Sequence, residues 1–173
     1  MRAKVRNGCA LRQPGMMQEA TSDEDRRLEI ALHEAGHAVI SRVVGLVGSK
    51  ATIVPTATSG GTAWWRHDNG IKSVLACLAG RAATEVILGH ATDEGCRFDD
   101  ETAMRLLTTG NGDVEREDWY ARKVREDLLR ECRKLVRQHR GAIEAVAHEP
   151  LDRETLSGWE IDRIIASASA TVH

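Results

Sequence analysis

The stretch from Glu24 to Val44 constrains the fold of this chain most, because its apolar residues recur at helical spacing. These positions are Leu28, Ala31, Leu32, Ala35, Val39 and Val43. Ser22 can cap the free amides at the start, and the acidic run 23–25 suits the positive end of a helix dipole. Gly45 provides a stop. The sequence therefore predicts one long helix with a buried face.

This predicted helix contains the string His33-Glu34-Ala35-Gly36-His37. Residues four apart share a helix face, so both imidazoles can reach one zinc ion. Glu34 projects toward the metal's open position, where a carboxylate can take a proton from water. Gly36 costs about 1 kcal/mol of helix stability relative to alanine, which suggests that another backbone approaches closely there. The string predicts a zinc hydrolase with Glu34 as the catalytic base.

A catalytic zinc site normally has three protein ligands and one open position. The spacing of the downstream residues leaves the third ligand open. The candidates are His67, His90, Cys96, Asp99 and Asp100.

The remaining pattern predicts a mainly helical α+β fold with a small β-sheet. Short β-branched and aromatic runs at 52–54 and 62–65 predict two strands. We expect helices at 71–88, 99–107, 115–148 and 156–169, with a loop at 95–98, a break near Gly141 and a helix end at Pro150. Residues 1–20 should form a flexible lead-in, and residues 21–173 a single domain.

Composition narrows the class of protein. A chain of 173 residues with 42% hydrophobic and 29% charged residues suits one soluble globular domain. The net charge of -2 gives no basic excess for nucleic acid, and no apolar run reaches the roughly 20 residues that span a bilayer. The four cysteines are widely spaced without a CxxC pair, which is typical of reduced thiols. We therefore expect a cytoplasmic protein that binds neither nucleic acid nor membrane.

Several motifs resemble the peptidase domain of FtsH-type zinc metalloproteases. His33 to Ala38 matches the HEAGHA string of that family, and 52–55 followed by 60–62 resembles its strand pair beside the active site. Ala79 to Glu85 with Gly89 is similar to the family's GGRAAEE stretch, and 154–161 to its ETL-x-G-x-E-I segment. The resemblance covers roughly residues 28–168 with the motifs in the family's order.

The resemblance implies a helical metallopeptidase domain with one zinc ion, acting on peptides or unfolded proteins. In this family the third ligand is an aspartate in a segment reading S-N-D-L-x-x-A-T. Matching its alanine to Ala103 selects Asp99, with Asp100 as the fallback if the register slips by one. Phe98 and Thr84 stand where the family has asparagine and glutamate.

FtsH proteins also carry an ATPase module and form rings. The phosphate-loop spacing G-x-x-x-x-G-K-[ST] is absent around residues 45–50, so we expect any ATPase to act in trans, and we expect a homo-oligomer. Two other functions fit the same residues. One is a catalytically silent peptide-binding module, and the other is a zinc hydrolase of non-peptide amides. The segment 60–64 could form an edge strand that pairs with an extended substrate.

Overall fold

The computed structural model describes residues 23–52, 54, 61–65, 70–108 and 114–170, so the expected lead-in at 1–20 lies outside them. The elements in chain order are α1 (Asp23–Val43), β1 (Gly48–Thr52), β2 (Thr62–Trp65), α2 (Ile71–Ile87), α3 (Asp93–Leu107), α4 (Val114–Gln138), α5 (Arg140–Arg153), β3 (Thr155–Ser157) and α6 (Gly158–Ala170). The expected α+β class, mainly helical with a small sheet, is confirmed.

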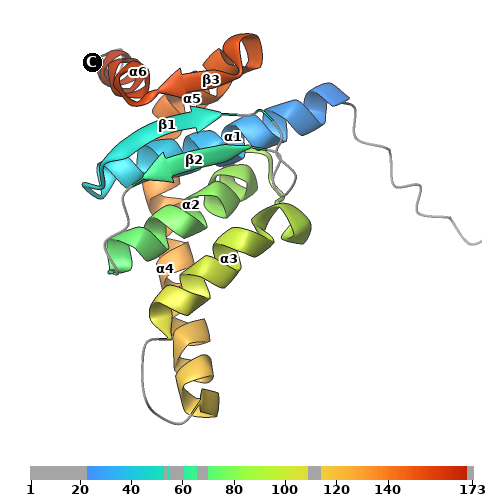
Figure 1. Cartoon of the computed structure of the whole chain (residues 1–173), viewed down its shortest axis with the longest axis vertical. Coiled ribbons are helices and arrows are strands. Elements are labelled where there is room, and N and C mark those ends of the chain that lie inside the picture. The colour runs from blue at the N-terminus through green and yellow to red at the C-terminus, as the bar shows by residue number, and fades with distance from the viewer. Residues whose placement is uncertain (1–22, 53, 55–60, 66–69, 109–113, 171–173) are drawn as a thin grey trace, which may run out of the picture.

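Helix α1 lies at the centre of the molecule, behind the strands in Figure 1, and packs on α2 and α5. Ten of the eleven residues from 31 to 41 are buried, and the exception, His33, is partly exposed. The crossing of α1 and α2 is close at Gly36, where a Cβ would lie 2.6 Å from the Ala79 carbonyl oxygen and 2.6 Å from Ala83 Cβ. The predicted close backbone approach at Gly36 is therefore confirmed.

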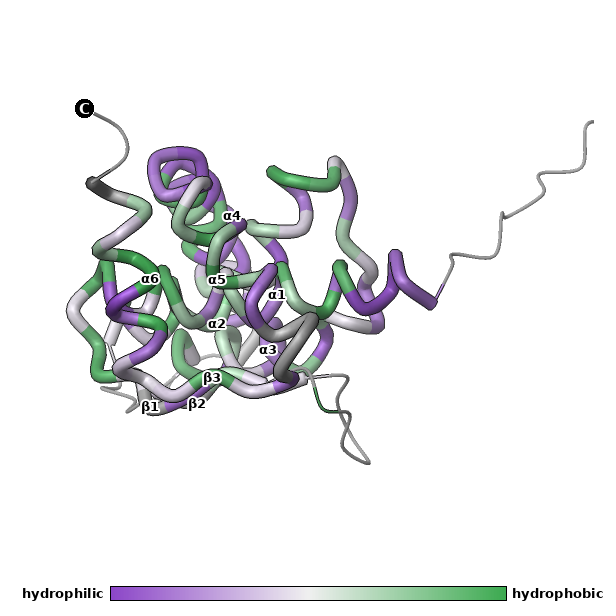
Figure 2. Tube along the Cα trace, turned by 90° about the horizontal axis from the view of Figure 1, so that it is seen from above, coloured by the Kyte–Doolittle hydropathy of each residue, from purple (hydrophilic) through white to green (hydrophobic). Residues whose placement is uncertain are grey.

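The sheet has three antiparallel strands in the order β2-β1-β3. Ala51 in the central strand pairs with Ala63 of β2 and with Leu156 of β3. Figure 2 shows the strands together on one side of the helices. Since β2 is an outer strand that contacts α1, it places an edge of the sheet beside the histidine-bearing helix.

The strand predictions were partly wrong. Strand β1 ends at Thr52, Val54 lies outside it and is 42% exposed, and Ile53 is outside the described residues. Lys50 is in the strand because it pairs with Trp64 and Ser157 on its two sides, so pairing outweighs intrinsic propensity. The three-residue strand β3 was not predicted at all.

Two helix boundaries also differ from the prediction. Helix α3 begins at Asp93, six residues early, because the Thr92 hydroxyl accepts the Gly95 N–H (3.3 Å) and acidic residues occupy the first turn. The predicted loop at 95–98 is therefore helical. Helix α5 continues past Pro150 to Arg153, so the predicted helix end at Pro150 is wrong.

Helix α4 is the longest element, and its N-terminal part extends past α3 (Figure 1). Trp119 and Tyr120 in this part are 67% and 63% exposed. No helix among the described residues has the length and apolar character required to cross a lipid bilayer. Cys77, Cys96 and Cys132 are free and buried.

Candidate metal centre

His33 and His37 lie one turn apart on α1 and direct their rings at each other. Their Nε2 atoms are 3.0 Å apart, and the rings meet edge to face with centroids 4.7 Å apart. The side chains are 13% and 3% exposed. The helical spacing that predicted a shared face therefore brings both imidazoles to one point.

Asp99 reaches this point from α3, 66 positions after His33 in the chain. Its Oδ2 atom lies 2.9 Å from His33 Nε2 and 3.1 Å from His37 Nε2. Among the described residues, this is the one group of three or more His, Cys, Asp or Glu side chains close enough to share a metal ion.

The other candidate ligands lie elsewhere or are not described. Asp100 turns away from the histidines and binds Arg81 and Arg125. Cys96 is buried outside the group, and burial raises its pKa to about 12. His90 is exposed, and His67 is outside the described residues.

The donor atoms fit a zinc ion. The Ala76 carbonyl accepts a hydrogen bond of 2.6 Å from His37 Nδ1, which leaves the Nε2 lone pair of the neutral ring facing Asp99. Two acceptor atoms only 3.1 Å apart repel unless a proton or a cation lies between them. Tetrahedral zinc with bonds of 2.0–2.1 Å separates its ligand atoms by about 3.3 Å, close to the three observed distances.

Gly80 on α2 provides the room for both rings. A Cβ at this position would lie 2.5 Å from His33 Nε2 and 2.6 Å from His37 Nε2. On another side, the Trp65 ring stacks on His37 with centroids 5.4 Å apart. This role of Gly80 was not predicted, although a glycine within a predicted helix is the same signal that pointed to Gly36.

Glu34 lies beside this group in a desolvated position. Its side chain is buried, it accepts a hydrogen bond from the Ala63 backbone in β2, and its Oε2 atom has no partner. Burial raises the pKa of Glu34 to about 8. A buried carboxyl oxygen without a protein partner has capacity for one further hydrogen bond, to a water molecule or a substrate.

The charges of the three ligand candidates are strongly coupled. Burial lowers the pKa of His33. Burial also acts to lower the pKa of His37, but the Asp99 carboxylate outweighs it and raises this pKa to about 9. Although burial acts to raise it, the pKa of Asp99 is held well below its usual range by His37 and His33. Asp99 therefore stays ionised and supplies negative charge to the cluster.

A family model described as Peptidase family M41 matches residues 20–109, just over half of the chain. The matched region includes His33, Glu34, His37 and Asp99.

Three curated relatives share the name ATP-dependent zinc metalloprotease FtsH. The protein from Thermus thermophilus is 27% identical over 83% of this chain and 30% of its own length. The protein from Acidimicrobium ferrooxidans is 28% identical over 90% of this chain and 30% of its own length. The protein from Oenococcus oeni is 32% identical over 48% of this chain and 13% of its own. The chain thus spans about a third or less of these relatives.

Proposed function

Because the chain belongs to peptidase family M41, we propose that it is a zinc-dependent metalloendopeptidase. It would hydrolyse peptide bonds in peptides or unfolded proteins. The supporting observation is the convergence of His33 Nε2, His37 Nε2 and Asp99 Oδ2 beside the buried Glu34 carboxyl group. The zinc metalloproteases among its relatives agree with this proposal.

In the proposed mechanism, His33, His37 and Asp99 would hold one zinc ion. When bound, zinc supplies Lewis-acid activation of water and of the scissile carbonyl group. Glu34 accepts a proton from the attacking water and then donates it to the leaving amine. In the metal-free protein, burial raises the pKa of Glu34 to about 8, so its carboxylate is a stronger base than that of an exposed glutamate. The Ala63 hydrogen bond fixes the orientation of this carboxyl group.

We propose that substrates bind as an added strand along β2. This strand is at an edge of the sheet, where main-chain groups can pair with an extended peptide. It is also tied to the metal centre at two points, by Ala63 at Glu34 and by Trp65 at His37. A peptide paired with β2 would therefore lie beside the proposed base and ligands. Since main-chain pairing ignores side chains, we expect broad specificity.

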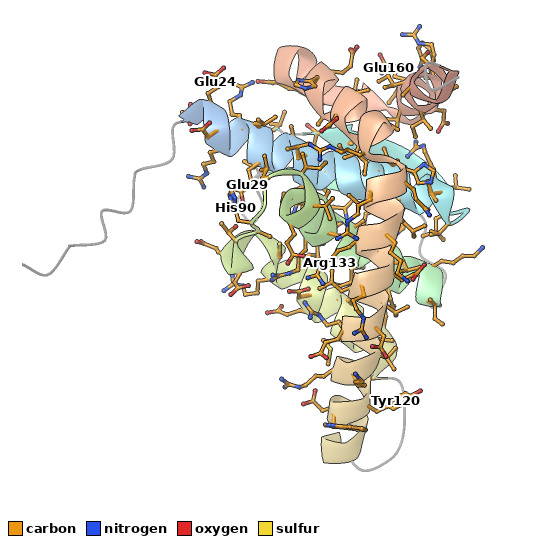
Figure 3. All side chains as sticks on the ribbon, turned by 180° about the vertical axis from the view of Figure 1, so that it is seen from behind. Glu24, Glu29, His90, Tyr120, Arg133 and Glu160 are labelled. Atoms are coloured by element: carbon orange, nitrogen blue, oxygen red, sulfur yellow. The ribbon has the colours of Figure 1, made fainter. Side chains whose placement is uncertain are left out.

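The test is Glu34→Gln, which keeps the size of the side chain and removes its basicity. We expect this variant to bind zinc like the parent and to cleave unfolded casein about 10²–10⁴-fold more slowly. Glu24→Gln is the matched control, because Glu24 is exposed at the far end of the same helix (Figure 3). Cleavage by Glu34→Gln at the parental rate would refute the role of the base.

The same assay separates the rival functions. A parent protein that binds zinc and unfolded casein without cleaving it would be the silent binding module. Turnover of small amides without cleavage of casein would indicate a non-peptide amidohydrolase. A homo-oligomer, an ATPase partner in trans and a cytoplasmic location remain predictions, which size-exclusion chromatography, ATP-dependent cleavage and cell fractionation would test.

A further inference from the structure

Helix α3 supplies the third side chain of the metal centre, yet it contributes little to the buried core. Of its 15 residues, only Cys96 and Ala103 are buried, whereas α2 buries most of its 17. Helix α3 packs on α2 and α4. Leu106 and Leu107 also pack against the core near the end of the helix, but they are only partly buried. The fully buried side chains, Cys96 and Ala103, are small, so polar contacts near Asp99 can contribute to the direction in which it points.

Asp100, the next residue, is held between two arginines from two different helices. Its Oδ2 atom accepts a hydrogen bond of 2.8 Å from Arg81 of α2, and its Oδ1 atom accepts one from Arg125 of α4. The three side chains are 15–21% exposed. Both oxygens of this carboxylate are therefore engaged in charge-assisted hydrogen bonds away from solvent, where such bonds are strongest.

Arg81 also contacts α3 at a second, solvent-exposed point. Its guanidinium also donates to Asp93 in the first turn of α3, at 2.9 Å. Asp93 and Asp100 are seven residues apart, which is about two helical turns and places them on one face. These contacts are shorter than the one from Arg81 to Glu85 on its own helix, at 3.7 Å. Glu85 in turn binds Arg133 of α4 at 2.7 Å (Figure 3 labels Arg133).

We propose that Arg81 and Arg125 are positioning residues for the metal centre, which fix the rotation of α3 by holding Asp100. Adjacent residues on a helix lie about 100° apart around its axis. With Asp100 held between α2 and α4, its neighbour Asp99 points at α1 and the two imidazoles. The same contacts prevent Asp100 from competing as a ligand. This inference rests on the proposed zinc site.

The test measures zinc affinity by competition with a chromophoric chelator, on the full chain. We expect Asp100→Asn and Arg125→Met each to weaken zinc binding about 10–100-fold, the range typical of residues that orient metal ligands. The ligand-field absorption of the Co²⁺-substituted protein should change in both variants. Because the two residues act as one unit, the double variant should bind zinc no more weakly than the weaker single variant.

The control is Arg130→Met on the same helix, because Arg130 forms an exposed ion pair with Asp127. It should leave zinc affinity and the Co²⁺ spectrum unchanged. The helical content of each metal-free variant is measured by circular dichroism, and the expected result is the parental value.

Three results would overturn the inference. The first is zinc affinity within twofold of the parent in Asp100→Asn and Arg125→Met. The second is additive losses in the double variant, and the third is metal-free variants that are unfolded, since the arginines would then be general stabilising residues. If the parent binds zinc and cleaves casein, and Asp100→Asn binds zinc equally well, only this inference is rejected. A parent that takes up no zinc would reject the proposed function as well.

Discussion

Replacing Gly80 by alanine should disable the metal centre while leaving the helices intact. The new Cβ would lie 2.5–2.6 Å from ring atoms of His33 and His37, whereas ordinary contacts start near 3.4 Å. The rings would have to retreat by about 1 Å, and metal–ligand distances tolerate only about 0.2 Å. His37 is poorly able to move, because it is hydrogen-bonded to Ala76 and stacked on Trp65.

We expect zinc binding by Gly80→Ala to be at least 100-fold weaker. With zinc in excess over both dissociation constants, that factor removes about 2.7 kcal/mol of zinc-dependent stabilisation. For a chain of this size, the loss corresponds to a zinc-induced rise in Tm that is smaller by about 5–10 °C. Chelator competition gives the affinity, and thermal unfolding with zinc or EDTA gives the stabilisation.

The matched control is Gly141→Ala on α5, where a Cβ would meet nothing within 4 Å. It should bind zinc like the parent. Alanine is favoured over glycine within helices, so neither substitution should lower the helical content of the metal-free protein. Zinc affinity of Gly80→Ala within threefold of the parent would contradict this prediction, because the two rings would then not depend on the space that this glycine leaves.

Two further predictions concern the packing and the charges of the same site. Gly36→Ala should lower the free energy of unfolding, measured by urea denaturation, by about 2 kcal/mol. The cost of overpacking against the α2 backbone outweighs the gain of about 1 kcal/mol in helix propensity. Parental stability of the variant would contradict this. In the metal-free protein, the pKa values of Glu34 and His37 are raised to about 8 and 9. The folded state therefore binds these protons more tightly than the unfolded chain does. The free energy of unfolding should fall as the pH rises through these values. Zinc displaces these protons, so the rise in Tm caused by zinc should instead grow with pH, and a pH-independent rise would contradict the assignment.

Local sequence patterns were sufficient for the parts of the fold that depend on local structure. The string from His33 to His37 predicted a shared helix face, and α1 has the two imidazoles 3.0 Å apart. Gly36 was explained by a close approach, which α2 provides. Both predictions depend only on the period of one helix, which the sequence carries within a few residues.

The predictions failed where distant segments decide the structure. Strand β3 has three residues and no local signal, and it exists because Ala51 and its neighbours pair with it. The spacing of the residues did not distinguish Asp99 from Asp100, because the choice depends on how α3 is rotated against α1. Arg81 contacts Glu85, four residues further along its own helix, but its shorter contacts are to Asp93 and Asp100 of α3, which no local pattern indicates.

The separation of 66 positions between His33 and Asp99 gives a bound ion a second role, as a cross-link. In the chain-entropy treatment, a covalent bond closing a loop of this length stabilises a protein by about 4 kcal/mol. Because α3 fully buries only two side chains, it should open more readily than α1 and α2 when the ion is removed. Amide hydrogen exchange in EDTA should then be fast throughout α3 while α1 and α2 stay protected. Zinc supply would thus control the local folding of this helix as well as the chemistry.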